Sequence, residues 1–281
     1  MKIKGIPTGN YKTAAIITGA AGGMGKIYAG ILAEHGYSLV LVDISRERLE
    51  QTAAEVSQVV AENGVEGKEN FRVLSLAQDL SAMDAAEKIA EAAAASGMVA
   101  EILINNAGLF FVKEIANADR KQLSSIMMVH NYTPLMLCRE FVPGMKARGH
   151  GYVLNISSLA AWLPWPALGM YSNTKRFIKG FSRSLRLECR GSGVSVTTAY
   201  FGAVDTPLYP LKPSLRRLAV RIYVMIPPRK AAEKALRAMF KGRKGLMPGL
   251  LNHIFRPIVA ILPDWIVGPA YGLIRKHVRN L

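Results

Sequence analysis

To about residue 200, the chain alternates short apolar runs with longer amphipathic segments. The runs are rich in Val, Ile and Leu and have the length of strands, whereas the longer segments carry apolar residues at helical spacing. Strands separated by helices pair in parallel, and a parallel sheet needs helices on both of its faces. This alternation predicts an α/β fold: a doubly wound, Rossmann-like parallel sheet in a single domain.

The same pattern predicts where the elements lie. We expect strands at 13–18, 38–43, 71–76, 101–105, 151–156 and 194–199. We expect helices at 24–35, 45–62, 82–95, 119–146, 171–190 and 229–241, the fourth disturbed at Pro134 because proline cannot donate a helical hydrogen bond. Beyond residue 206 the rhythm changes, and prolines break an apolar and basic segment into pieces.

The cysteine content and the apolar runs bear on the compartment. Cys138 and Cys189 are the only cysteines, which gives no disulfide framework and no metal site, and favours a reducing compartment. The amino-terminal segment lacks the sustained apolar region of a signal peptide. No window offers about 18 consecutive apolar residues, the length that a spanning helix needs. We therefore expect a cytoplasmic protein, in contact with a membrane only at its periphery if at all.

The positive charge is concentrated in the last part of the chain. Of the net charge of +16, residues 206–281 carry +13, with Glu233 and Asp264 as their only carboxylates. This asymmetry predicts an acidic partner: an anionic membrane surface, an acidic carrier protein or a phosphorylated substrate. A solvated basic face without a partner is the alternative. We do not expect nucleic acid, because no recognition motif accompanies the charge.

A glycine-rich turn joins the first predicted strand to the first predicted helix, in the sequence Thr-Gly-Ala-Ala-Gly-Gly-Met-Gly from Thr18 to Gly25. Glycines let a backbone turn sharply and approach a pyrophosphate, which the helix amino terminus then stabilises. Asp43 ends the next strand, where a carboxylate accepts hydrogen bonds from the adenosine ribose. The spacing predicts a dinucleotide site, and a tight structural turn is the alternative.

Asp43 also bears on the choice of dinucleotide. A carboxylate there repels a 2′-phosphate, and the glycine turn contains no Lys or Arg to compensate. This favours NAD. Arg46 and Arg48 lie close by in sequence, so NADP remains the alternative.

Tyr171 and Lys175 are four residues apart, so a helix would project both from one face. A free tyrosine titrates near about 10, and a neighbouring ammonium favours the phenolate that a base requires. Ser158, at the end of an apolar run, could donate a hydrogen bond to a substrate oxygen. A solvated lysine beside a half-buried tyrosine is the alternative.

Taken together and in order, these motifs over about residues 12–240 resemble the classical short-chain dehydrogenases and reductases. Asn105-Asn106-Ala107-Gly108 matches the family's Asn-Asn-Ala-Gly motif. The family also has an acidic and apolar pair that contacts adenine, a catalytic Asn on the following helix, and a Ser, Tyr and Lys at this spacing; the corresponding residues are Asp79-Leu80, Asn131, Ser158, Tyr171 and Lys175.

The resemblance implies a role for each residue. Tyr171 would be the general acid or base, Lys175 would lower its pKa and hold the nicotinamide ribose, and Ser158, favoured over Ser157 by the spacing, would orient the substrate oxygen. Asn131 would help to hold a water that links Lys175 to solvent. The residues implied to bind the cofactor are Gly19, Ala21, Gly23, Met24, Gly25, Asp43, Asp79, Leu80, Asn106, Ala107, Gly108, Tyr171, Lys175, Gly202 and Thr206.

One loop departs from the family. After the sixth strand the family has Pro-Gly followed by Thr, and here Gly202 and Thr206 match while Phe201 replaces the proline. We expect Thr206 still to contact the carboxamide end of the nicotinamide.

Apolar residues dominate the segments that face substrate in such a fold, and they favour an apolar ketone, such as a steroid, a long acyl chain or a polyketide-like ketone, over a sugar. Ordinary core or interface residues are the alternative. These residues are Phe110, Phe111, Trp162, Leu163, Trp165, Leu208, Tyr209, Leu211 and Met225.

The chain is thus expected to be an NAD(P)-dependent oxidoreductase that interconverts a secondary alcohol and a ketone, of 3-oxoacyl or hydroxysteroid type. The alternative is a catalytically weak, dinucleotide-binding regulatory or interaction protein. We expect the catalytic domain at 1–245 and, at 246–281, an extension that packs on the same domain, a partner subunit or a membrane, similar to that of some acyl- and steroid-type reductases. The resemblance also implies a homodimer or homotetramer.

Overall fold

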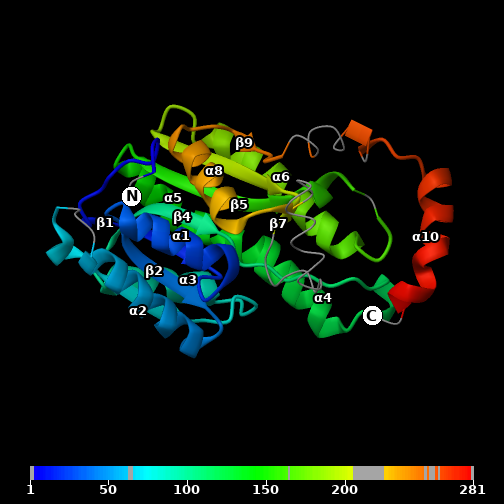
Figure 1. The fold of residues 1–281 in the computed structure, drawn as a ribbon, viewed down its shortest axis with the longest axis horizontal. Coiled ribbons are helices and arrows are strands. Elements are labelled where there is room, and N and C mark those ends of the chain that lie inside the picture. The colour runs from blue at the N-terminus through cyan, green and yellow to red at the C-terminus, as the bar shows by residue number, and fades with distance from the viewer. Residues whose placement is uncertain are drawn as a thin grey trace.

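The computed structural model describes residues 3–62, 66–163, 165–204, 225–249, 252, 257–258 and 260–279. Its centre is a seven-stranded sheet in which every neighbouring pair is parallel, in the order β3-β2-β1-β4-β5-β6-β9 (Figure 1). The strands are β1 (Thr13–Thr18), β2 (Ser38–Asp43), β3 (Val73–Ala77), β4 (Val99–Asn105), β5 (Gly151–Ser158), β6 (Val194–Phe201) and β9 (Gly245–Leu246). The predicted doubly wound parallel sheet is confirmed.

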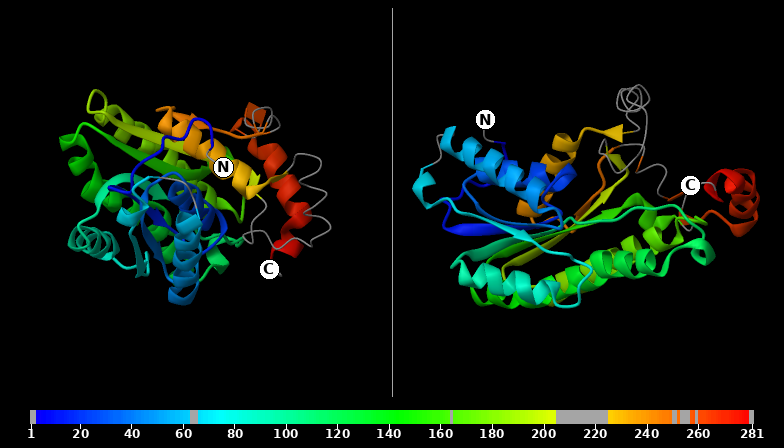
Figure 2. Two further views of the ribbon diagram at one scale, coloured as in Figure 1. Left: turned by 60° about the vertical axis from the view of Figure 1, so that its left-hand side comes forward. Right: turned by 90° about the horizontal axis from the view of Figure 1, so that it is seen from below.

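Helices cover both faces of this sheet (Figure 2). One face packs against α1 (Gly23–Glu34), α2 (Arg46–Glu62) and α8 (Pro228–Phe240). The other packs against α3 (Ala85–Ala95), α5 (Thr133–Ala147) and α6 (Gly169–Glu188). Short helical turns connect these elements at η1 (Lys68–Asn70), η2 (Ile115–Asn117) and η4 (Leu159–Trp162).

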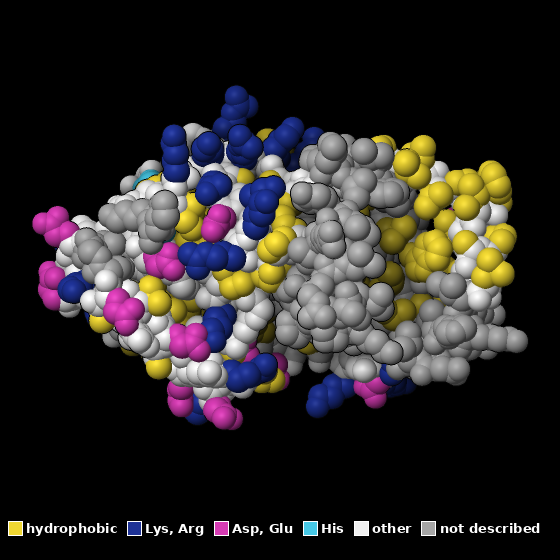
Figure 3. All heavy atoms as spheres, viewed as in Figure 1, with side chains coloured by type: hydrophobic (Ala, Val, Ile, Leu, Met, Phe, Trp, Pro, Cys, Tyr) yellow, Lys and Arg dark blue, Asp and Glu magenta, His cyan; other side chains and the backbone are white. Residues whose placement is uncertain are grey.

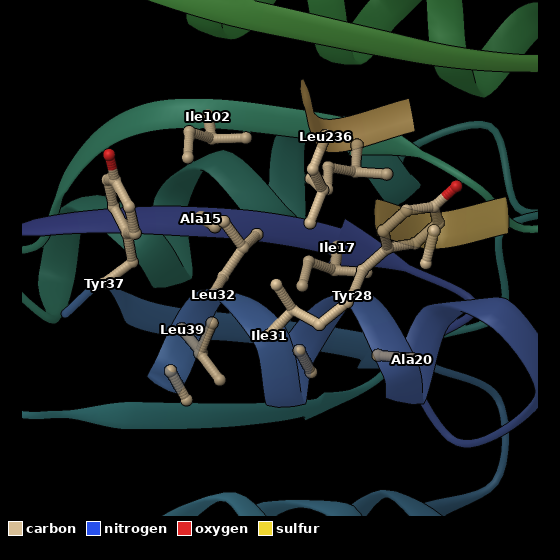
Figure 4. Packing of buried hydrophobic residues seen from close by; sticks show 14 of the residues in the cluster. Ala15, Ile17, Ala20, Tyr28, Ile31, Leu32, Tyr37, Leu39, Ile102 and Leu236 are labelled. Carbon is tan, nitrogen blue, oxygen red and sulfur yellow. The ribbon is translucent and has the colours of Figure 1, made fainter. Parts of the chain in front are cut away.

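Successive residues of a strand enter opposite cores, which is why the strands are apolar at every position rather than at alternate ones. Ile17 of β1 packs under α1 and α8, whereas its neighbour Ile16 packs under α3 and α5. On the first face, Ile31 and Leu32 of α1 lie over β1, with Leu236 of α8 beside them (Figure 4). Because both faces are buried, a strand such as β1 does not alternate apolar and polar residues.

The predicted helix at 119–146 is not one regular helix. It consists of α4 (Arg120–Met127), a π-helical turn η3 (Met128–Tyr132) and α5. Pro134 has no N–H and its ring crowds the carbonyl four residues earlier, so the irregularity falls just before it, in the turn that it disturbs. This wide turn is where His130 and Asn131 lie.

The last part of the chain is more regular than expected. Strands β7 (Ala203–Val204) and β8 (Met225–Ile226) form a separate parallel pair, and β9 adds the seventh strand, beside β6. Helix α10 (Asp264–Arg279) begins directly after Pro263 and continues through Pro269, whereas the prolines at 207, 210 and 213 lie outside the described residues. Pro269 is exposed, so water can satisfy the carbonyl that loses its helical hydrogen bond.

The expected boundary between 245 and 246 falls inside β9, and the division into a domain and an extension stays a prediction. In the described part of the chain no helix is both long and apolar enough to cross a bilayer.

The glycine turn is packed so tightly that only glycine fits at two of its positions. A Cβ at position 25 would overlap the carbonyl oxygen of Gly19, and one at position 19 would lie 2.9 Å from Cα of Ala107. Gly30, one turn further along α1, has open space around its Cβ position.

We predict that Gly25→Ala lowers the free energy of unfolding by at least about 2 kcal/mol, because backbone rather than a flexible side chain must move. Gly30→Ala, on the same helix, should raise it by about 0.5–1 kcal/mol, since alanine favours a helix interior. Chemical denaturation without cofactor measures both. Equal effects of the two substitutions would contradict the packing described for the turn.

Candidate active site

A cleft of about 420 Å³ opens along the sheet edge where the strands end, across the carboxyl ends of β1, β2, β4 and β5. In a doubly wound sheet the chain turns to opposite faces at this edge, which leaves room for a ligand. Among the predicted site residues, those that line the cleft are Gly19, Gly23, Met24, Asp43, Asn106, Ala107, Gly108, Ser158, Tyr171, Lys175 and Gly202.

The glycine turn forms the wall of the cleft at the start of α1. Gly19 and Gly23 have φ of +67° and +52°, a left-handed conformation that favours glycine. A Cβ added at Gly22 or Gly23 would meet no atom within 4 Å, and no side chain caps α1. The start of α1 therefore has open space beside it and no side-chain cap, and this arrangement fits a pyrophosphate at the helix amino terminus.

Asp43 anchors the turn at the end of β2. Its Oδ2 accepts the N–H of Ala21 at 3.0 Å, and its Oδ1 accepts the N–H of Ser45 at 3.1 Å. Ala21 itself does not line the cleft, so its place in the site is to hold Asp43. Arg48, which we did not predict as a site residue, lines the same cleft, and its Nε donates to Ser45 Oγ at 3.2 Å.

Asn106 ties the glycine turn to the loop after β4. Its Nδ2 donates to the carbonyl of Thr18 at 2.9 Å and to that of Gly19 at 3.3 Å. In return, Thr18 Oγ1 accepts the backbone N–H groups of Asn106 and Ala107 at 3.0 and 3.1 Å. The two loops that face the cleft from β1 and β4 are thus held as one unit.

Lys175 and Tyr171 occupy one face of α6, as their spacing predicts, and both are buried. The Nζ of Lys175 donates to the carbonyl of Ile156 at 3.1 Å and lies 5.8 Å from the centroid of the Tyr171 ring. Burial lowers the pKa of the Lys175 ammonium to about 8. The group is still mostly charged at neutral pH, so a positive charge stands beside the phenol.

The two serines at the end of β5 differ in their hydrogen bonds. The Ser157 hydroxyl donates to the carbonyl of Lys175 at 2.9 Å and so joins β5 to α6. Ser158 Oγ accepts the N–H of Ala160 at 3.1 Å, which leaves its O–H to donate elsewhere. This difference favours Ser158 as the residue that donates to a substrate.

The wide turn η3 lies behind α6. Asn131 is buried and its Nδ2 donates to the carbonyl of Thr174 at 3.0 Å, so it lies outside the cleft lining. His130, which we did not predict, does line the cleft. Burial and the nearby Lys175 ammonium hold the pKa of His130 well below its ordinary value, so the ring is neutral at physiological pH.

Comparison with known proteins agrees with this geometry. The sequence profile described as short chain dehydrogenase matches residues 13–213. The chain belongs to the short-chain dehydrogenase family. It is therefore an NAD(P)-dependent oxidoreductase, and the expected family and enzyme class are confirmed.

Named relatives of this short-chain dehydrogenase include two reductases. The very-long-chain 3-oxoacyl-CoA reductase of Homo sapiens is 33% identical over 265 residues, which cover 90% of this chain and 76% of that protein. The reductase of the same name from Rattus norvegicus is 31% identical over 276 residues, with 95% and 80% covered.

Solved structures share the fold. A metagenomic short-chain oxidoreductase in complex with NADP is 25% identical, with a TM-score of 0.68 and coverage of 85% of this chain and 96% of that chain. A 7β-hydroxysteroid dehydrogenase is 24% identical, with a TM-score of 0.76 and coverage of 91% and 92%.

Several predicted residues of this short-chain dehydrogenase do not line the cleft. Gly25 is buried beneath Gly19, and the Leu80 carbonyl accepts the hydroxyl of Thr133 at 2.7 Å, so it holds the start of α5. The Asp79 carboxylate accepts the N–H and O–H of Ser81 at 2.8 and 2.7 Å. A contact of Asp79 and Leu80 with adenine stays a prediction. Thr206, Leu208, Tyr209 and Leu211 lie outside the described residues.

The aromatic residues expected to face substrate separate into two groups. Phe110 meets the Tyr171 ring edge-to-face at 5.1 Å, next to the cleft. Trp162 instead packs on the Tyr200 ring at 4.8 Å, with Lys179 Nζ 4.4 Å from its centroid. Phe201, in the family's proline position, lines the cleft, whereas Met225 is a buried residue of β8.

The residues that sequence reasoning missed are short-range neighbours of ones it found. His130 directly precedes Asn131, and Arg48 lies five residues after Asp43, in the first turn of α2. The only sequence signals were Pro134, which disturbs the turn at His130, and the basic character of the start of α2.

Proposed function

We propose that this chain interconverts a secondary alcohol and a ketone on an apolar substrate, with Tyr171 as the general acid or base. The observation that carries the proposal is the juxtaposition of Ser158, Tyr171 and buried Lys175 along one cleft with the glycine turn. A phenol beside a buried ammonium is a means of moving a proton near neutral pH.

Each residue has a distinct task in this proposal. In reduction, the Tyr171 hydroxyl donates its proton to the carbonyl oxygen, and in oxidation the phenolate accepts the alcohol proton. The Lys175 ammonium stabilises the phenolate, and the Ser158 hydroxyl donates a hydrogen bond to the same substrate oxygen. A nicotinamide dinucleotide, when bound, supplies or accepts the hydride at the carbon. Asn131 holds α6 through Thr174, with the water-holding role that the family implies still a prediction.

The residues proposed to hold the dinucleotide are those of the glycine turn, Asp43, Asn106 to Gly108 and Lys175. Asp43 favours NAD, since its carboxylate suits ribose hydroxyls and repels a 2′-phosphate. Arg48 in the same cleft would attract a 2′-phosphate. NAD is therefore the proposed cofactor, with NADP a weaker second.

The proposed substrate is a long-chain 3-oxoacyl thioester, with a hydroxysteroid as the alternative. The names of the relatives at 33% and 31% identity support the acyl type. Phe110 against Tyr171 provides an apolar surface next to the proposed acid.

We also propose that the chain assembles as a homodimer or homotetramer through α4, α5 and α6. Large apolar side chains are exposed on each of these helices, which suits an interface between copies of the chain. They are Met127, Leu135, Phe177 and Leu187.

A membrane surface is the proposed partner of the other end of the molecule. Hydrophobic side chains gather over α10 (Figure 3), where Trp265 is 75% and Leu273 85% exposed, with Ile261 at 80% just before the helix. The sequence around them is basic. An apolar helix face with Trp, within a basic segment, suits the interface of an anionic bilayer better than an acidic carrier protein.

We predict that Tyr171→Phe loses at least about a thousandfold in kcat while cofactor affinity stays within about threefold, because only the proton transfer is removed. Turnover should be measured on a panel of 3-oxoacyl thioesters and hydroxysteroids with NADH and NADPH. The control is Tyr152→Phe, on β5, where Tyr152 packs on Phe240 away from the cleft. A Tyr171→Phe enzyme with near-normal kcat would refute the proposed role; a wild type that binds dinucleotide without turning over any of the panel would favour the regulatory alternative.

Substitution of Asp43 tests the cofactor preference. Asp43→Asn should lower the ratio of kcat/KM for NADH over NADPH by about tenfold or more, since the charge that rejects the 2′-phosphate is lost. Arg48→Ala should raise the same ratio by weakening NADPH alone. If neither substitution moves the ratio, cofactor choice lies elsewhere.

Vesicle co-sedimentation tests the membrane contact. The full chain should bind phosphatidylcholine vesicles that contain phosphatidylserine, and binding should weaken at high salt. Trp265→Ser with Leu273→Ser should lose binding several-fold, whereas Met83→Ser, 65% exposed elsewhere on the surface, should not. Equal vesicle binding of the wild type, the double variant and Met83→Ser would refute the membrane contact. A loss of self-association in the double variant would indicate that a second copy of the chain, rather than a membrane, covers α10.

A further inference from the structure

His130 lies between the loop after β4, on the cofactor side of the cleft, and α6, which carries Tyr171 and Lys175. The proposed mechanism gives it no task. Its side chain is buried, with 1% of the residue exposed. Nε2 accepts the backbone N–H of Leu109 at 2.8 Å, and Nδ1 lies 2.8 Å from Thr174 Oγ1. Leu109 follows the Asn-Asn-Ala-Gly segment beside the cofactor cleft, and Thr174 precedes Lys175.

These contacts fix one tautomer. Because Nε2 accepts a hydrogen bond, the ring proton of a neutral His130 is on Nδ1, which then donates to Thr174 Oγ1. The Thr174 hydroxyl in turn donates to the carbonyl of Tyr171 at 2.8 Å. An unbroken chain of three hydrogen bonds runs from the backbone of Leu109 to the backbone of the proposed acid.

The ring contacts follow the same path. The His130 ring meets that of Tyr171 edge-to-face at 5.8 Å. A Cβ at Gly108 would lie 3.2 Å from His130 Nε2 and 3.8 Å from Lys175 Nζ, so the loop backbone, the imidazole and the ammonium converge at one place.

We propose that His130 is a positioning residue for the reaction, one that holds the Leu109 loop through Nε2 and the Tyr171 turn of α6 through Nδ1 and Thr174. This inference rests on the proposed function, because it assumes that Tyr171 acts on the substrate. The hydrogen bond to Leu109, called the loop arm, sets the cofactor side of the cleft. The hydrogen bond to Thr174, called the α6 arm, sets the position of the Tyr171 phenol.

The chain contains a second buried histidine that serves as a matched comparison. His35 is fully buried, its Nε2 accepts the N–H of Ile3 at 3.0 Å, and its Nδ1 lies 3.3 Å from the carbonyl of Pro7. It holds the amino-terminal segment in a similar way, but it is not among the residues that line the cleft. Effects common to both histidines are therefore structural, and effects specific to His130 belong to the site.

Two substitutions of His130 test its two hydrogen bonds separately. The amide of His130→Asn reaches about as far as Nδ1, so it keeps the donor to Thr174 and loses the acceptor for Leu109. The amide of His130→Gln reaches about as far as Nε2 and does the reverse. The Asn variant should raise KM and Kd for NADH about five- to tenfold with kcat within about threefold, and the Gln variant should lower kcat about tenfold with Kd little changed.

Thr174→Val provides an independent test of the second arm. It should lower kcat as His130→Gln does. The double variant with Thr174→Val and His130→Gln should lose no more kcat than either single variant, because both substitutions remove the same hydrogen bond between residues 130 and 174. His35→Asn and His35→Gln are the controls, and they should lower thermal stability without a split between KM and kcat.

Cofactor affinity is to be measured by quenching of tryptophan fluorescence as well as by turnover, so the loop arm is tested even if Tyr171 proves not to be the acid. Kinetic constants of both His130 variants that match wild type, with only a loss of stability like that of the His35 variants, would overturn the proposal. Additive losses in the Thr174 and His130 double variant would overturn its second arm. A near-normal kcat of Tyr171→Phe would instead overturn the proposed function. The NADH affinities of the His130 variants would then still show whether the hydrogen bond to Leu109 positions the cofactor side of the cleft.

Discussion

Every strand of the main sheet runs in the same direction and the central strands are buried on both faces, and the rest of the molecule follows from this constraint. A parallel strand must be followed by a crossover on one face or the other, so all the carboxyl ends meet along one edge. The side chains that end β1, β2, β4 and β5 are therefore brought together although they lie far apart in sequence. Thr18, Asp43, Asn105 and Ser158 are those residues.

Buried polar side chains near this edge join the elements to one another through hydrogen bonds. Asn105 Nδ2 donates to Asn155 Oδ1 at 2.8 Å, and Asn155 Nδ2 donates to Ser182 Oγ at 2.8 Å. This network joins β4, β5 and α6, and a buried amide left unpaired would cost free energy comparable to a lost hydrogen bond. The same bonds that stabilise the core thus set the position of α6, and with it Tyr171 and Lys175, relative to the glycine turn.

The positions of strands β1 to β6 and many of the residues that line the cleft could be predicted because their signals are local. The apolar runs at β1 and β2 begin and end where the pattern predicts, since glycine and polar residues bound them. Tyr171 and Lys175 share a face because four residues make about one helical turn. Asp43 ends β2 and Gly202 directly follows β6, so both line the cleft at the edge where the strands end.

Other features depend on contacts that no local pattern encodes. The extra strand β9 exists because it pairs with β6, and α10 continues through Pro269 because that side faces solvent. His130 was missed since a lone histidine on a helix has no periodic signature, and its partners Leu109 and Thr174 are 21 and 44 residues away. Asp79 and Leu80 carry a recognisable motif, yet their groups are engaged with Ser81 and Thr133.

By itself the sequence determined the parallel α/β fold, the glycine turn and the spacing of Ser158, Tyr171 and Lys175, because helical and strand periodicity and the steric demands of glycine act over a few residues. Only the tertiary structure decided which serine is left to donate, that Lys175 is buried enough to bring its pKa to about 8, and that His130 joins the two halves of the site. Burial and hydrogen-bond partners are properties of segments brought together from across the chain, and they exist only once the sheet has assembled.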